Sequence, residues 1–131
     1  MNVELKNKIK ISLEKLLQRE NEDSFVIIED VKTGKFVQFA GGKYEELLFD
    51  IPQQILSKEE KERADKILND HNIFYESHPV YDDNNSELEV GKQYGFSKKL
   101  NNDINLAVEL VEKVMKKVYL IENVSIEFTE N

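Results

Sequence analysis

The chain has 131 residues, of which 40% are hydrophobic, so it is long enough for one packed domain and too short for two. Its 26 acidic and 18 basic residues give a formal net charge of −8, which disfavours binding to nucleic acid or to an anionic membrane surface. Cysteine is absent, which excludes disulfides, thiolate nucleophiles and cysteine-ligated zinc.

The first predicted element is a helix from Val3 to about Arg19. Leucine and isoleucine recur at intervals of three and four residues between Leu5 and Leu17, with Lys and Glu between them. This spacing places one apolar stripe along the helix. We therefore expect the helix to pack on an apolar surface.

Three strands are predicted between Ser24 and Pro52. The runs 25–30 and 35–40 are rich in β-branched and aromatic residues, and a turn that ends at Gly34 joins them. A third run, 47–51, follows Gly41-Gly42 and is stopped by Pro52. We expect an antiparallel meander.

The predicted register of the first two strands pairs Val31 with Lys35, which places Ile27 opposite Phe39. In that register both faces of the sheet are apolar. One face carries Phe25, Ile27, Val37 and Phe39, and the other carries Val26, Ile28, Phe36 and Ala40 with Asp30 and Gln38 among them. Two apolar faces need cover, either from helices of the same chain or from a partner.

A second helix is expected from Ser57 to about His71. Ser57 and Glu60 have the spacing of a capping box, in which the two side chains satisfy free backbone amides at the start of a helix. Few residues form an apolar side, so we expect a peripheral cover or an interface element. These residues are Ala64, Ile67 and Leu68.

A second hairpin is predicted between residues 73 and 96. Pro79 suggests an edge strand, the return strand runs from Leu88 to Phe96, and the polar segment 82–87 joins the two. Acidic and amide residues stand at alternate positions of this segment, such as Asp82 and Asn84, as in a calcium-binding loop. However, Glu87 and Gln93 stand where a calcium-binding EF-hand needs Gly and a bidentate Glu. We interpret it as a solvated loop and predict no metal site.

The last helix should start near Asn102-Asp103 and has the strongest apolar stripe, which extends from Ile104 to Val118. The segment 124–128 then alternates as a short strand does. The elements predict a single α+β domain over residues 1–131, with helices and an antiparallel sheet in the order α-β-β-β-α-β-β-α. The sheet has five strands, or six if the C-terminal segment pairs.

The sequence contains no recognisable catalytic constellation. The two histidines, His71 and His78, have no carboxylates near them at ligand spacing. Gly41-Gly42 does not belong to the complete Gly, Lys and Ser/Thr pattern of a phosphate-binding loop and is interpreted as a turn. Carboxylates are so abundant that neighbouring pairs are expected by chance. We therefore predict that the protein is not an enzyme and has no catalytic residue, metal or cofactor.

Several segments resemble the TY-Chap group of proposed peptide chaperones, which has a type III secretion chaperone-like fold. The most telling segments are 36–39, Phe-Val-Gln-Phe, and the strand that ends in Pro52 shortly before the helix start at Ser57. The resemblance covers most of residues 3–120. It implies a small acidic protein, often dimeric in the secretion-chaperone branch, that holds an extended segment of a partner protein.

Together, the apolar meander and the resemblance predict a non-enzymatic, cytoplasmic module that binds a protein or peptide segment, with a homodimer as one arrangement. The predicted partner-binding residues are Val26, Ile28, Phe36 and Gln38, and the Gln38 amide could bond to a visiting backbone. The alternative is an acidic immunity or inhibitor protein that blocks a basic toxin. Salt separates the two, because charge-steered binding weakens as ionic strength rises.

Overall fold

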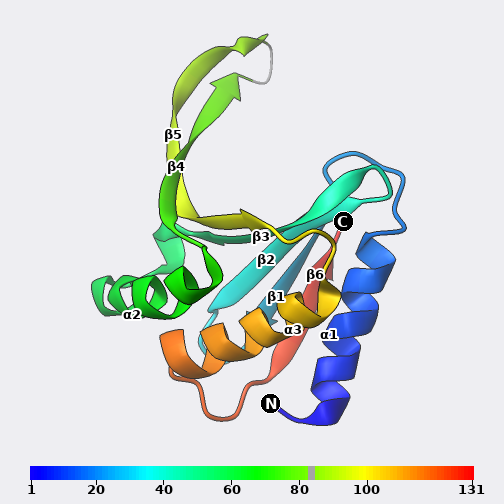
Figure 1. Ribbon diagram of the computed structural model, residues 1–131, viewed down its shortest axis with the longest axis vertical. Coiled ribbons are helices and arrows are strands. Elements are labelled where there is room, and N and C mark those ends of the chain that lie inside the picture. The colour runs from blue at the N-terminus through cyan, green and yellow to red at the C-terminus, as the bar shows by residue number, and fades with distance from the viewer. Residues whose placement is uncertain (83–84) are drawn as a thin grey trace.

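The computed structural model describes residues 1–82 and 85–131. They form three α-helices and a six-stranded sheet in the order β4-β5-β3-β2-β1-β6 (Figure 1). Every neighbouring pair of strands is antiparallel. The predicted α+β class is confirmed, and the C-terminal segment supplies the sixth strand.

The bounds of the elements lie close to the predicted ones. The strands are β1 (Phe25–Asp30), β2 (Phe36–Gly42), β3 (Glu45–Pro52), β4 (Tyr75–Asp82), β5 (Asn85–Lys99) and β6 (Ile126–Glu130). The helices are α1 (Val3–Leu16), α2 (Lys58–Leu68) and α3 (Ile104–Lys113), and α3 continues into a π-helical turn, η3 (Val114–Val118). Two short 3-10 turns are η1 (Gln53–Ile55) and η2 (Asn69–His71).

Side-chain caps fix where the helices begin. The Ser57 Oγ accepts from the Glu60 N–H at 3.1 Å, and the Glu60 carboxylate accepts from the Ser57 N–H at 2.8 Å, so the predicted capping box is confirmed. Asp103 caps α3 in the predicted place, and Asn2 caps α1. None of the helices in the described part of the chain is long and apolar enough to span a bilayer.

The helices all lie on one face of the sheet (Figure 1). Burial alternates residue by residue along β1 and β2, and Val26, Ile28 and Phe39 have no exposed surface. These side chains pack with the apolar stripes of α1 and α3 in one continuous core. The sheet is therefore covered on one face only, whereas the sequence suggested that both faces need cover.

The register between β1 and β2 differs by one residue from the predicted one. Val26 pairs with Phe39 and Ile28 with Val37, whereas Ile27 pairs with Gln38. The predicted alternation along each strand holds, but the grouping of the two strands into faces was wrong. Because side chains alternate with a period of two, the shift by one residue exchanges the faces of one strand relative to the other.

The turn between β1 and β2 explains this shift. The Asp30 N–H donates to the Lys35 carbonyl and the Gly34 N–H to the Asp30 carbonyl, both at 2.8 Å, so residues 31–34 form the loop. The Asp30 carboxylate stabilises this longer loop by accepting from the Thr33 N–H at 3.1 Å and the Thr33 hydroxyl at 2.8 Å. Gly34 has φ 75°, which glycine adopts without strain.

The two adjacent glycines end a strand instead of forming the predicted turn. Gly41 and Gly42 belong to β2, and the pairing of β2 with β3 is irregular between Ala40 and Gly42. The turn itself lies at Lys43 and Tyr44. A β-bulge therefore accommodates the glycine pair at the end of the strand.

The β4–β5 hairpin extends past the body of the sheet (Figure 1). β5 pairs with β3 only from Gly95 to Lys99, and its remainder pairs with β4 alone. A Cβ at Gly95 would lie 2.4 Å from the Ile51 carbonyl oxygen, so glycine permits this close crossing. The predicted loop over 82–87 lies partly outside the described residues, and β5 already begins at Asn85.

Candidate functional site

The sheet face opposite the helices is the candidate functional site, and we call it the open face. Its apolar side chains are partly buried by their neighbours on adjacent strands, and they are Phe25, Ile27, Phe36, Ala40 and Leu48. None of them belongs to the core or to the partly buried set that packs on it. Polar side chains share the face, and they include Glu29, Gln38, Asp50, Ser97, Lys99, Glu127 and Thr129.

Asp50 organises the polar part of the open face. One carboxylate oxygen accepts from the Gln38 amide on β2 and the other from the Ser97 hydroxyl on β5. These bonds tie the three central strands together and orient Gln38 on the surface. They also engage both Asp50 oxygens, so this carboxylate serves as an acceptor that fixes its neighbours.

Two hollows lie on the open face, with volumes of about 300 and about 400 Å³. Phe25 and Gln38 line the first, His78 and Gln93 line the second, and Leu48 lines both. Both hollows are partly open to solvent, and they lie side by side because Leu48 and Asp50 line both of them.

The structure divides the predicted partner-binding residues between the two faces. Val26 and Ile28 lie on the helix-covered face with no exposed surface, so their assignment to a partner surface was wrong. Phe36 and Gln38 lie on the open face, as a partner surface requires. The register error also hid Ile27, which pairs with Gln38. Asp30, whose side chain can close a longer turn, was the feature of the sequence that pointed to the observed register.

An acidic pair marks one side of the open face. Glu29 on β1 lies directly opposite Glu127 on β6, and Glu127 is exposed. Like charges in directly opposed positions of an antiparallel pair destabilise it. The chain thus keeps an electrostatically unfavourable contact at the rim of this face, and a cationic group bound beside it would relieve the repulsion.

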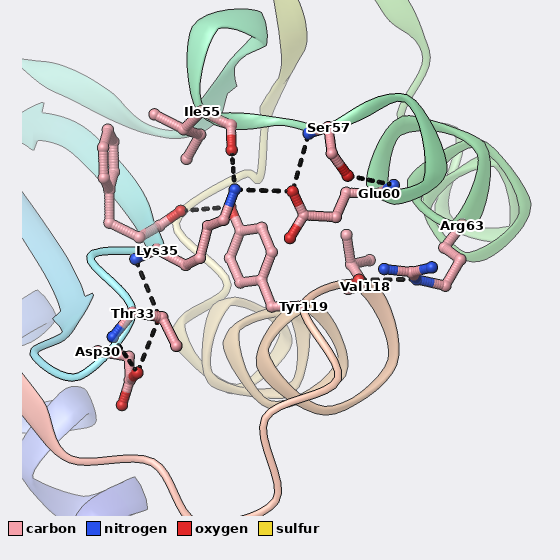
Figure 2. A network of polar contacts seen from close by, with 10 residues as sticks. Asp30, Thr33, Lys35, Ile55, Ser57, Glu60, Arg63, Val118 and Tyr119 are labelled. Carbon is pink, nitrogen blue, oxygen red and sulfur yellow. Dashed lines mark hydrogen bonds and ion pairs between the residues drawn. The ribbon is translucent and has the colours of Figure 1, made fainter.

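A second polar cluster joins β2, α2 and the end of α3 (Figure 2). The Lys35 ammonium lies 2.7 Å from the Glu60 carboxylate and also donates to the Ile55 carbonyl. Burial alone would raise the pKa of Glu60, but hydrogen bonds from Lys35 and Ser57 outweigh it and hold this pKa below its ordinary value. The cluster links three elements, which is a structural role.

Tyr119 closes this cluster. Its hydroxyl donates to the Phe36 carbonyl at 2.6 Å, and its ring lies 5.8 Å from the Lys35 ammonium (Figure 2). Burial and the nearby Glu60 charge raise the pKa of Tyr119 far above its ordinary value, so the phenol stays protonated as a donor. Among the described residues, no buried side-chain nitrogen or oxygen lacks a hydrogen-bond partner. These contacts account for the cluster without a ligand.

The histidines are held apart on different elements. His71 Nε2 lies 2.9 Å from the Lys113 ammonium, whereas His78 is exposed on β4. In residues 1–82 and 85–131, no group of three or more His, Cys, Asp or Glu side chains could hold a metal ion. Neither histidine therefore has the surroundings of a metal ligand in the described part of the chain.

Comparison of the chain with family models, with curated proteins and with solved structures finds no match in any of the three. The resemblance to the TY-Chap group therefore stays a prediction.

Proposed function

We propose that this protein is a non-enzymatic, chaperone-like module of the cytoplasm that binds an extended segment of another protein on its open face. One observation carries the proposal. Apolar side chains such as Ile27, Phe36 and Leu48 lie on a sheet face that no helix of residues 1–82 and 85–131 covers, and they stand outside the core. Such a face is stabilised when a partner removes its apolar surface from water.

The arrangement of the open face favours an extended chain as the occupant. Ile27 pairs with Gln38, and Leu48 lies on the same face as Asp50, so a bound segment meets apolar contacts beside oriented polar ones. Interfaces combine these features, with apolar contacts for affinity and a few fixed polar groups for register.

Peptides selected by phage display against the wild-type protein test this proposal. Ile27→Lys should weaken binding of the selected peptides about tenfold or more, because a charge replaces the apolar side chain that pairs with Gln38 on the open face. Val3→Lys is the matched control, because Val3 is 74% exposed on α1. It should bind as the wild type does, and both variants should keep the wild-type urea midpoint. Unchanged binding by Ile27→Lys would contradict the proposal.

The acidic pair favours a second candidate, an immunity or inhibitor protein that binds a basic toxin through charge. Glu29, Glu127 and the net charge of −8 supply the field for such an encounter. The affinity for a selected partner should then fall steeply as salt increases, because exposed charges are screened. Binding led by the apolar contacts of the open face should change little over the same range.

A further inference from the structure

The free backbone groups of the edge strand β6 can be assigned from its ladder with β1. Phe25 and Asn131 exchange both backbone hydrogen bonds, at 3.2 and 3.0 Å. In an antiparallel pair, such exchanging positions alternate with positions that exchange none. Glu127 and Thr129 therefore bond to β1. The backbone groups of Ile126, Phe128 and Glu130 point away from the sheet.

The two edges of the sheet are built differently. β4 carries Pro79, and its pairing with β5 is irregular between Val80 and Asp82. Both features discourage pairing with a further strand. β6, with the sequence Ile-Glu-Phe-Thr-Glu, has no proline, glycine or lysine and pairs with β1 in unbroken register. It therefore lacks the features that protect β4, and it offers a regular template for an added strand.

The two sides of the β6 edge differ in chemistry. On the open face the edge presents Glu127 beside Glu29. On the helix side, Ile126 and Phe128 are partly buried against the core. The acid on that side, Glu130, is already engaged by the Ser12 hydroxyl at 2.8 Å and the Arg19 guanidinium at 3.3 Å. An added strand would thus meet free negative charge on one face and apolar side chains on the other.

We propose that the β6 edge binds an extended segment of a partner protein in which basic and apolar side chains alternate. The segment adds a further strand through the backbone groups of Ile126, Phe128 and Glu130. Its basic side chains lie beside Glu127, and its apolar ones lie beside Ile126 and Phe128. This inference goes beyond the proposed function, because it places a partner segment at the β6 edge of the sheet and not on the open face.

A second copy of the chain fits this edge less well. Each copy has a net charge of −8, and β6 itself contributes only acidic charged residues, Glu127 and Glu130. Pairing two such edges would bring negative charge to negative charge, which opposes association. A basic segment has the opposite effect, because it neutralises the repulsion between Glu29 and Glu127.

Amide hydrogen exchange followed by NMR tests the inference. The probe is a short peptide, blocked at both ends, that alternates lysine and valine, and the matched control peptide alternates glutamate and valine. At saturation, the lysine peptide should slow exchange about tenfold or more at Ile126, Phe128 and Glu130. Glu127 and Thr129, already bonded to β1, should change little, and the glutamate peptide should protect none of these amides.

A charge reversal separates this site from general attraction. Glu127→Lys should weaken binding of the lysine peptide about tenfold. Glu62→Lys makes the same change of charge at an exposed position of α2 and should leave the affinity within about twofold of the wild type. Equal losses in both variants would show attraction by net charge alone and would overturn the inference.

Three other outcomes would also overturn it. Equal binding of both peptides would remove the role of charge. Changes in the NMR signals of Ile27 and Leu48 alone would place the segment on the open face, where the proposed function would still stand. Protection of β6 that rises with protein concentration in the absence of peptide would make a second copy the occupant. Protection of β6 by the lysine peptide, with no peptide selected at the open face, would support the edge site and count against the open-face binding proposed above.

Discussion

The same strands build two faces of the sheet that differ in their exposure to solvent and in what packs on them. On the covered face, Ile28 and Leu47 have no exposed surface and pack with the helices. Their chain neighbours Ile27 and Leu48 lie on the open face, partly exposed and outside the core. Stability therefore resides on one face, and the other is available for binding, although both have apolar side chains. Hydrophobic composition alone does not reveal which role a strand residue has.

The largest expected difference between the faces concerns two phenylalanines of β2. Phe39 has no exposed surface and makes an edge-to-face contact with Phe49 at 5.8 Å, so Phe39→Ala should destabilise the fold by about 3–5 kcal/mol. Phe36→Ala, on the open face, should cost about 1 kcal/mol or less. Urea unfolding of both variants measures the difference. Equal losses would mean that Phe36 belongs to the core and would remove the contrast.

Asp30 gives the next largest effect, because it ties the covered end of β1 to the segment that leads into β6. Its buried carboxylate accepts from the Thr33 N–H and hydroxyl and from the Ser125 N–H at 2.9 Å. Asp30→Asn should lower the free energy of unfolding at neutral pH by about 1.5–3 kcal/mol, because charge-assisted hydrogen bonds are lost. Thermal or urea unfolding at neutral pH gives the value.

The same variant predicts a pH dependence. Burial would raise the pKa of Asp30, but the hydrogen bonds from Ser125 and Thr33 outweigh it and hold this pKa below its ordinary value. The stabilisation is therefore complete above the pKa of the unfolded chain and is lost as the pH falls through the lower pKa of the folded state. The difference between wild type and Asp30→Asn should shrink below about pH 4. A difference that stays constant down to pH 3 would contradict this assignment.

The smallest effect has the opposite sign and belongs to the open face. Glu127→Gln should stabilise the protein by about 0.2–1 kcal/mol, because it removes the repulsion with the opposed Glu29. The gain should diminish in high salt, which screens the exposed pair. Unfolding at low and high ionic strength checks both points. A destabilised variant would show that Glu127 is favourably placed in the free protein.

The sequence predicted the order of the elements because periodicity and capping residues are local properties. Ser57, Glu60 and Asp103 marked helix starts that the structure confirms. The faces of the meander could not be predicted in the same way, since they depend on one residue of register. That register follows from the turn of residues 31–34, which the Asp30 carboxylate closes through Thr33, and the sequence fits a shorter loop as well. Half of the predicted partner-binding residues fell on the wrong face for this reason.

The most direct test of a binding role for the open face follows methyl groups by NMR while a selected peptide is added. Ile27 and Ile28 are neighbours in the chain, as are Leu47 and Leu48, and each pair divides between the two faces. If the segment binds on the open face, the methyl signals of Ile27 and Leu48 should shift with added peptide, and those of Ile28 and Leu47 should stay in place. Equal shifts in both members of each pair, or shifts confined to Ile28 and Leu47, would contradict a binding role for the open face.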